Sequence, residues 1–560
     1  MKKPTALFTI AVTLLSISSL PVTATDAQLP PGSNMIVGSA HSFSVSPPLR
    51  DMTVCAGASA SVPSRVEARR TLTVPEFEGI GLAEIAGNDP RADLCTSAPT
   101  QLADDGSGAV GPKHYVQVVN MALAVYDKLG NRLAGPIATK TFWKDQPDCA
   151  GLYTDSVVIY DRHADRWVIS RPAILMGEAG IGLCLAVSVT SDPTGRYYQY
   201  AFAINTEANG LANLVNDYPK ISTWPEFYLA TALPNRIYCG VGNTVSAFDR
   251  AAMLAGDRAP GYVTFYVPAP VAGDFSPTCV MPSGVAHTHM LPADLDGKKL
   301  PPAGAPGYIV QVQDENWGFP AGRLQIYEIH VDWTDPSSAT LIPTTSLTPE
   351  TFNSNPCPWD NGNGLSCIQQ PQGHLLDATA WGFMMYRLSY RNFGSHQTLL
   401  FNHTVAADGD PSHRHSGIRW YELRGSKTAP WFIYQQGTYA PDENNRWMGS
   451  IAMDRHGDIA LGFNVSGANL YPSIRYASRR PSDPLGQLPR GEVSIIEGHG
   501  AQLTSTDWGD YSQMTIDPTD DCTFWYTNEY YPRTTNPDRW HTRIAAFRFS
   551  ECHGRENQDE

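Results

Sequence analysis

The sequence predicts an all-β fold, a β-propeller stapled by disulfides, on three observations. Gly (47) and Pro (44) are abundant while charged residues make up only 17% of the 560 residues, a balance typical of turn-rich β proteins. A unit of apolar strand, Asp-led tight turn and second apolar strand recurs along the chain. The ten cysteines are an even number without a C-x-x-C pair, which favours disulfides over zinc or iron-sulfur ligation.

The first residues have the pattern of a signal peptide over residues 1–24. Lys2 and Lys3 precede an apolar stretch that ends at Leu20, and small residues follow at the expected cleavage region. No later apolar run has the length that a bilayer requires. We therefore expect a protein exported to the periplasm or the medium. Residues 25–105 are rich in Ser, Ala, Pro and Thr, which predicts an irregular segment draped on the main domain.

The recurring unit predicts β-hairpins, because Asp, Pro and Gly supply the local hydrogen bond, the fixed φ and the positive φ of tight turns. It occurs at residues 125–130, 159–167, 191–195, 452–457 and 515–520.

A polar residue stands directly before the first strand of several units. Where such residues are consecutive, they lie roughly sixty to seventy residues apart, which fits a four-stranded blade. We expect the propeller over residues 106–552, with seven blades or, alternatively, six, and a charged tail over residues 553–560. The competing fold is a β-sandwich with accessory modules, which has the same strand spacing.

The cysteines are expected to form five bridges between sequence neighbours, because blades close locally. The expected pairs are Cys55 with Cys95, Cys149 with Cys184, Cys239 with Cys279, Cys357 with Cys367, and Cys522 with Cys552.

Charge and motifs exclude several classes of function. The formal net charge of -15 argues against a nucleic-acid partner, which needs Lys and Arg clusters. No G-x-S-x-G elbow, H-E-x-x-H, P-loop or dinucleotide fingerprint occurs, so serine esterases, common metalloproteases, kinases and dehydrogenases lack support. The Asp box of sialidases is also missing, because Gly follows Asp by three residues in these turns rather than two.

Several long and unusual strings occur along the chain. They are Asp217-Tyr218-Pro219-Lys220, Tyr390-Arg391-Asn392-Phe393-Gly394 with Asn402-His403, Ile418-Arg419-Trp420-Tyr421-Glu422-Leu423, Asn445-Arg446-Trp447-Met448-Gly449-Ser450, Trp508-Gly509-Asp510-Tyr511-Ser512 and the run from Asp521 to Tyr531. In these strings the sequence resembles secreted bacterial β-propeller-like proteins of unassigned activity. The resemblance spans most of residues 150 to 550. It implies the fold and export, and it supplies no catalytic residues. The sequence departs from the family at His287-Thr288-His289 and His413-Arg414-His415.

The residues that open the predicted inner strands are the first candidates for catalysis. Asp155, Asp217, Arg446 and Asp510 are expected to converge near one mouth of the central channel. Two carboxylates facing each other there could act as acid and base, or acid and nucleophile, on a glycoside. In the structural alternative, each Asp caps its own turn or pairs with Arg446 to close the ring.

A second set resembles the needs of a polysaccharide lyase, in which a cation or imidazole neutralises a uronate and a Tyr or His moves the proton. This set is Tyr218, Lys220, Arg391 and His403. Its structural alternative is that these side chains order loops and blade edges. Arg446, Trp447 and Tyr511 complete the residues expected to contact a substrate.

Aromatic residues near polar ones suit sugar stacking or packing between blades, and packing is the expected role of most of them. They are Trp224, Trp317, Trp420, Trp447, Trp508, Trp525, Tyr530 and Tyr531.

No cofactor is expected. The two His-x-His strings could begin a zinc or copper site, although no third ligand is identifiable. The Asp- and Asn-rich turns could hold calcium, but none matches a dedicated calcium loop.

These observations predict a monomeric, exported propeller that engages a polysaccharide or cell-surface glycan, as a glycoside hydrolase or a polysaccharide lyase. The alternative is a non-catalytic adhesin or protein-binding scaffold. A deep mouth with facing carboxylates would favour the first, and a filled mouth with its polar groups already paired would favour the second.

Overall fold

The computed structural model describes residues 35–55, 73–81, 104–151, 154–175, 180–211, 214–235, 242–269, 289–357, 366–378, 384–407, 415–535 and 539–553. Over these residues the chain is all-β, as predicted, and most of its strands pair with their sequence neighbours in antiparallel sheets.

The first sheets follow one another along the chain. One consists of β4 (Ser107–Val110), β5 (His114–Val119), β6 (Ala122–Asp127) and β7 (Arg132–Ala138). The next contains β8 (Val157–Asp161), β9 (Arg166–Ile174), β10 (Ile181–Ser188) and β11 (Tyr197–Asn205). A third contains β12 (Val215–Thr223), β13 (Phe227–Asn235), β14 (Gly242–Asp249) and β15 (Gly261–Pro268).

An eight-stranded sheet comes next, and it consists of two four-stranded halves. The first half is β16 (Met290–Asp296), β17 (Gly307–Gln313), β18 (Arg323–His330) and β19 (Thr340–Leu347). The second is β22 (Met384–Asn392), β23 (Gln397–Ala406), β24 (Ser416–Ser426) and β25 (Ala429–Tyr439). The halves join where β16 and β22 pair in parallel, from Ala293 with Leu388 to Asp296 with Arg391.

The last sheets are β26 (Asn445–Met453), β27 (Ile459–Gly467), β28 (Leu470–Arg479) and β29 (Glu492–Ile496), and then β30 (Gln513–Ile516), β31 (Phe524–Tyr530) and β32 (His541–Phe547). A small pair, β20 (Ser366–Ile368) and β21 (Leu376–Asp377), lies apart from them. The helices are short: α2 (Thr139–Phe142), α3 (Arg250–Ala255) and the 3-10 turns η1 (Leu49–Asp51), η2 (Pro147–Cys149), η3 (Glu207–Asn209), η4 (Glu315–Trp317), η5 (Pro336–Ser338) and η7 (Ser550–His553).

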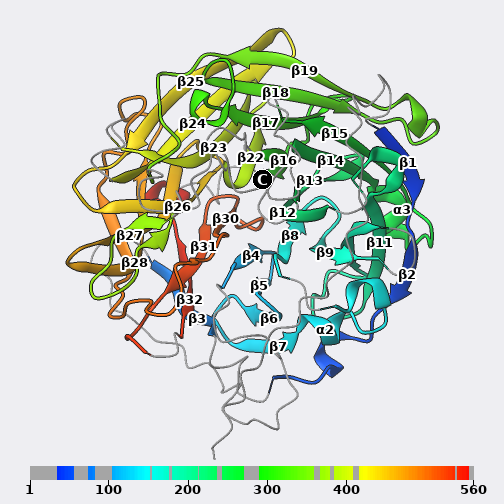
Figure 1. Cartoon of the computed structure of the whole chain (residues 1–560), viewed down its shortest axis with the longest axis horizontal. Coiled ribbons are helices and arrows are strands. Elements are labelled where there is room, and N and C mark those ends of the chain that lie inside the picture. The colour runs from blue at the N-terminus through cyan, green and yellow to red at the C-terminus, as the bar shows by residue number, and fades with distance from the viewer. Residues whose placement is uncertain are drawn as a thin grey trace, which may run out of the picture.

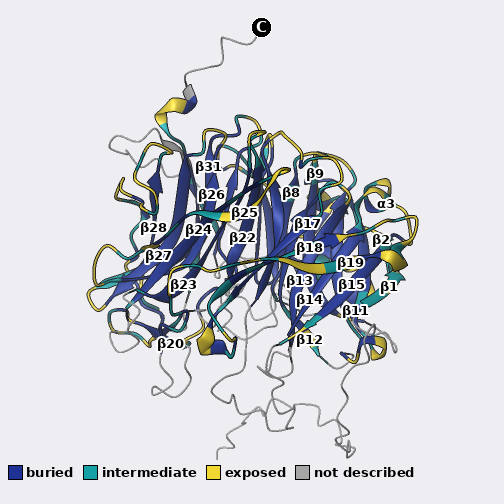
Figure 2. Cartoon of the chain, turned by 90° about the horizontal axis from the view of Figure 1, so that it is seen from above, coloured by how far each residue is buried: buried dark blue, intermediate teal, exposed yellow. Residues whose placement is uncertain are grey.

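The sheets radiate from a common centre, which gives a propeller-like all-β fold (Figure 1). The strands β4, β8, β12, β16, β22, β26 and β30 lie nearest that centre, and the later strands of each sheet lie further out. In Figure 2 most strands are buried along most of their length, and exposed residues gather in the turns and on outer strands such as β19.

Neighbouring sheets pack face to face through aromatic pairs. The rings of Tyr115 on β5 and Trp525 on β31 stack with their centroids 5.4 Å apart. The Tyr476 ring on β28 lies 3.8 Å from Phe547 on β32. Strands such as β10 are therefore apolar on both faces, because both are covered. All eight of the aromatic residues considered for sugar stacking are at most 4% exposed, which places them in the core.

Strands from the N-terminal segment complete the sheets. Strand β1 (Met35–Ser39) pairs with β15, β2 (Ser42–Val45) pairs with β11, and β3 (Thr73–Gly81) pairs with β32. The described parts of residues 25–105, a segment expected to be irregular, therefore contribute strands. The sequence gives few signals for these strands, because they pair with strands far away in the chain.

Three of the predicted disulfides are confirmed, Cys149–Cys184, Cys357–Cys367 and Cys522–Cys552. Cys55 is also disulfide-bonded. Its predicted partner Cys95 and the predicted pair Cys239 and Cys279 lie outside the described residues.

Candidate functional site

Six of the predicted site residues lie together where the innermost strands begin. Asp155 precedes β8, Asp510 and Tyr511 precede β30, and the other three open β12. Those three are Asp217, Tyr218 and Lys220. Because the innermost strands all begin at one mouth of the ring, residues far apart in sequence meet there.

Lys220 is the centre of this cluster. Its side chain is buried, with 1% exposed, and its Nζ atom lies 3.2 Å from the ring centroid of Tyr511 and 4.0 Å from that of Tyr218. The two rings stack at 5.3 Å. Among the described residues, Nζ donates no hydrogen bond. Burial lowers the pKa of Lys220 to about 7, although the nearby carboxylates, Asp155 above all, act to raise it.

The carboxylates around Lys220 are linked by hydrogen bonds. The Tyr511 hydroxyl donates to Asp155 Oδ2 at 3.2 Å, and the Asp510 backbone N–H donates to Asp105 Oδ1 at 2.7 Å. The Asn120 side chain donates to Asp105 and accepts a hydrogen bond from the Asp155 N–H. Burial raises the pKa of Asp105 well above its ordinary value, and the charge of Asp155 adds to the shift.

The backbone at this mouth is strained in three places. Asp105, Asp155 and Tyr218 have φ angles of 42°, 61° and 56°, in the left-handed region that a bulky residue such as Tyr rarely adopts. The pairing of β12 with β13 shifts between Asp217 and Lys220, which is a β-bulge. A bulge redirects side chains, and strain of this kind clusters at functional sites.

Sequence reasoning missed two members of the cluster, Asp105 and His289. His289 precedes β16, is fully buried, and packs edge-on against the Tyr218 ring at 5.9 Å. Burial lowers the pKa of His289 well below its ordinary value, so the imidazole is neutral. A local signal for Asp105 existed: like Asp155, it precedes a short apolar inner strand by two residues.

A second acidic pair lies behind the mouth. Asp104 and Glu529 are both 0% exposed, and the Gly509 N–H donates to Glu529 Oε2 at 3.2 Å. Burial raises the pKa of Asp104 to about 6 and that of Glu529 well above its ordinary value. Two carboxyl groups buried in one site titrate as a coupled pair.

Four predicted site residues lie elsewhere. Arg391 makes two hydrogen bonds, of 2.7 and 2.9 Å, to the Asp521 carboxylate. His403, whose pKa burial lowers to about 3, stacks on Tyr421. Arg446, expected at the mouth, instead binds Asp442 and Glu492, and Trp447 packs on Trp508 with ring centroids 5.6 Å apart.

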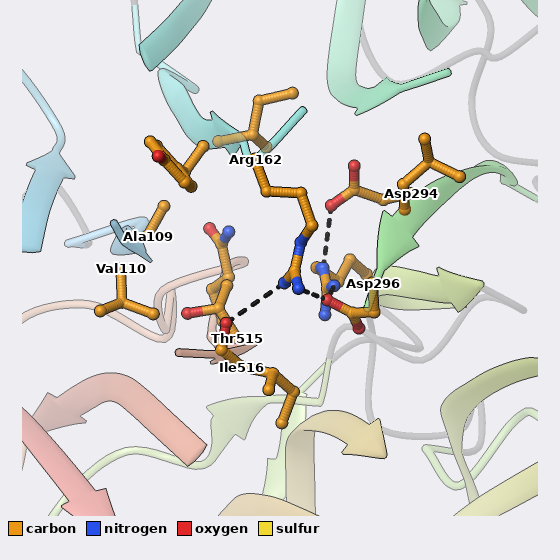
Figure 3. Close-up of a pocket in the computed structure, with 12 residues that line it drawn as sticks. Ala109, Val110, Arg162, Asp294, Asp296, Thr515 and Ile516 are labelled. Atoms are coloured by element: carbon orange, nitrogen blue, oxygen red, sulfur yellow. Dashed lines mark hydrogen bonds and ion pairs between the residues drawn. The ribbon is translucent and has the colours of Figure 1, made fainter. Parts of the chain in front are cut away.

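The opposite part of the centre is closed by ion pairs. Arg162 binds Asp296 at 2.9 Å, and Arg387 binds Asp294 at 2.9 Å and also Asp296. Figure 3 shows Arg162 pointing between Asp296 and the strand that carries Thr515. The cavity lined by these residues has a volume of about 20 Å³, room for roughly one water molecule. It cannot admit a sugar.

The predicted His-x-His metal sites stay untested, because His287 and His413 lie outside the described residues. Of their partners, His289 belongs to the Lys220 cluster, and His415 Nε2 lies 3.0 Å from the Asn444 carbonyl oxygen. No helix in the described part of the chain is long and apolar enough to span a membrane.

Comparison with known proteins finds no matching family model and no matching curated protein. Among solved structures, a PL25 ulvan lyase has a TM-score of 0.36 at 9% identity and covers 78% of this chain and 96% of its own. An endo-arabinase from Bacteroides thetaiotaomicron has a TM-score of 0.26 at 11% identity, with coverages of 60% and 95%. An α-L-arabinofuranosidase from Fusarium graminearum scores 0.27 at 8%, with coverages of 69% and 91%. These neighbours are carbohydrate-active enzymes, and at these scores none carries an argument about activity.

Proposed function

We propose that this protein is an exported, seven-bladed β-propeller that hydrolyses glycosidic bonds in a carbohydrate polymer at the mouth around Lys220. The blade number is supported by the seven innermost strands, each of which leads a four-stranded unit once β3 is counted with β30, β31 and β32. Export is supported by the disulfides, which persist in oxidising compartments.

The observation that carries the activity is the meeting of Asp155, Asp217 and Asp510 beside a buried lysine. Asp217 and Asp510 are half-buried, so we assign these two carboxyl groups to the substrate. Glycoside hydrolysis needs such a pair, one as acid and the other as base or nucleophile. Asp155 is buried and holds the Tyr511 hydroxyl, and we assign it a positioning role.

Charge favours hydrolysis of a neutral glycan over cleavage of a uronate polymer. The mouth carries several carboxylates, which repel an anionic chain. A lyase would need accessible cations, but Lys220 lies behind two aromatic rings. Arg391 and His403, the other groups expected to serve a lyase, are bound elsewhere in the fold.

The test is release of reducing ends and of unsaturated products from a panel of neutral and uronate polysaccharides. We expect reducing ends from a neutral polymer, and a loss of roughly 10²-fold or more in Asp217→Asn and Asp510→Asn, the size typical of acid–base groups. Asp332→Asn, an exposed carboxylate after β18, is the matched control and keeps full activity. Unsaturated products from a uronate polymer would instead establish a lyase.

One observation favours the second candidate function, a non-catalytic binding scaffold. Tyr218, Lys220 and Tyr511 are at most 6% exposed, and Asp105 and Asp155 already accept hydrogen bonds from their neighbours. Side chains that fill the mouth in this way stabilise the closed ring and catalyse no reaction. Glycan binding without product release, unchanged by Asp510→Asn, supports this candidate against the hydrolase.

A further inference from the structure

Potential metal ligands surround the Cys522–Cys552 disulfide, in the turn between β26 and β27 and after β32. One ligand atom each of His456, Cys522 and Cys552 lies within 4.8 Å of the other two. The Oδ2 atom of Asp454 lies 3.2 Å from Cys522 Sγ and 3.7 Å from Cys552 Sγ. The site therefore gathers two sulfurs, an imidazole and a carboxylate from three separate segments.

The carboxylate of Asp454 is held in place, but no group in the described part of the chain donates a hydrogen bond to its Oδ2 atom. Asp454 is 0% exposed, and its Oδ1 accepts the backbone N–H groups of His456 at 2.8 Å and Asp458 at 3.0 Å. The sulfurs of a disulfide carry no hydrogen, so neither sulfur contact is a hydrogen bond. Burial raises the pKa of Asp454 to about 7, and the nearby cation that opposes this shift, Arg391, is already paired with Asp521. A buried oxygen without a donor is costly unless another group satisfies it.

We propose that reduction of Cys522–Cys552 creates a tetrahedral site for a zinc-class divalent cation, with Asp454, His456, Cys522 and Cys552 as its ligands. With Zn–S near 2.3 Å and Zn–O near 2.0 Å, the O···S edge of a tetrahedron is roughly 3.5 Å. The two Asp454 oxygen-to-sulfur distances, 3.2 and 3.7 Å, lie on either side of that value. To complete the geometry the sulfurs must separate, and the exposed His456 ring must move towards the Asp454 carboxylate.

The chemistry balances with a dithiol as reductant. The dithiol gives two electrons and two protons to the S–S bond, which yields two thiols and the cyclic disulfide of the reductant. The cation then displaces the two thiol protons, since thiolates are the ligands. His456 is exposed, which opens the site to solvent. In the thiol state the metal holds both the turn at Asp454 and the C-terminal η7 to the last sheet, and in the oxidised state the disulfide holds η7 there.

The experiment titrates the full-length mature protein with Co²⁺ after dithiol reduction and removal of the dithiol without oxygen. We expect a sulfur-to-cobalt charge-transfer absorption that saturates at one ion per chain, disappears on addition of Zn²⁺, and is absent before reduction. Asp454→Asn and His456→Ala weaken Co²⁺ binding by about tenfold or more. Asp332→Asn, an exposed carboxylate after β18 that belongs to none of the ligand segments, leaves the affinity unchanged.

Alkylation mapped by mass spectrometry gives a second readout on the unaltered sequence. Zn²⁺ should slow the alkylation of Cys522 and Cys552 in the reduced protein, compared with the same protein without metal. No charge-transfer band, a band of equal strength in Asp454→Asn and His456→Ala, or equal alkylation of these two cysteines with and without Zn²⁺ overturns the proposal.

Discussion

At the scale of single residues, the candidate site is organised by charges that are buried together. Lys220 lies between two tyrosine rings and among carboxylates, so its ammonium form loses hydration that the rings only partly replace. The four predicted site residues that lie elsewhere each bind a local partner, such as Asp521 for Arg391. Their residue types were compatible with a site, but sequence alone does not reveal which neighbour each one meets.

The Lys220 cluster predicts a particular pH dependence of stability. Because the pKa falls from 10.5 to about 7 on folding, the unfolded chain binds more protons between these values, and stability rises with pH. The contribution of Lys220 is complete above pH 10.5 and is lost as the pH falls to about 7. Lys220→Met removes this rise. Urea unfolding of both proteins between pH 7 and pH 10 checks it, and parallel curves would contradict it.

The pair Asp104 and Glu529 predicts the opposite dependence. Both have raised pKa values, so their contribution to stability is present at acidic pH and is lost as the pH rises through about 6, the pKa of Asp104. Glu529→Gln removes one of the two acids, so the decline in the free energy of unfolding between pH 5 and pH 8 becomes smaller. An unchanged or steeper decline argues against two buried acids with raised pKa values.

At the scale of secondary-structure elements, the sequence predicted the features whose signals lie within a few neighbouring residues. Each of the five predicted Asp-led turns joins two paired antiparallel strands, because the signals for a tight turn lie within the turn itself. The bulge in β12 and the strands of the N-terminal segment left no such signal. They depend on partners that only the closed ring brings near.

The turn before β30 contains a glycine that the acidic pair requires. A Cβ at Gly509 would overlap the Asp104 carboxylate and lie 2.8 Å from Glu529 Oε2. Gly509→Ala should lower the free energy of unfolding by about 1–3 kcal/mol, the usual cost of overpacking. Gly322→Ala, whose added Cβ meets no atom closer than 3.8 Å, is the matched control. Chemical denaturation compares the two, and equal stability of both variants contradicts the packing argument.

At the scale of the whole molecule, the ring closes between its two ends. Strand β3 pairs with β32, so the N-terminal segment supplies the outer strand of the sheet that the C-terminal strands form. Sequence composition predicted an all-β chain with local disulfides because both are local properties. It could not predict this closure, whose pairing joins residues such as Phe77 and Ile544.

Removal of the closing strand should therefore destabilise the whole ring. A chain that starts at residue 82 leaves the apolar β32 as an open edge, which favours association. We expect a lower melting temperature and soluble aggregates. A chain that starts at residue 35 keeps β1, β2 and β3 and serves as the control. Thermal unfolding with size-exclusion chromatography distinguishes them, and equal behaviour of both chains contradicts closure by β3.

Cleavage of a neutral glycan at the mouth around Lys220 can be tested by a crystal structure of Asp510→Asn with a neutral oligosaccharide bound. We expect a glycosidic oxygen within hydrogen-bonding distance of the side chains at positions 217 and 510. A sugar bound on the outer rim, or a mouth that stays closed by Tyr218 and Tyr511 with oligosaccharide in excess, would contradict it.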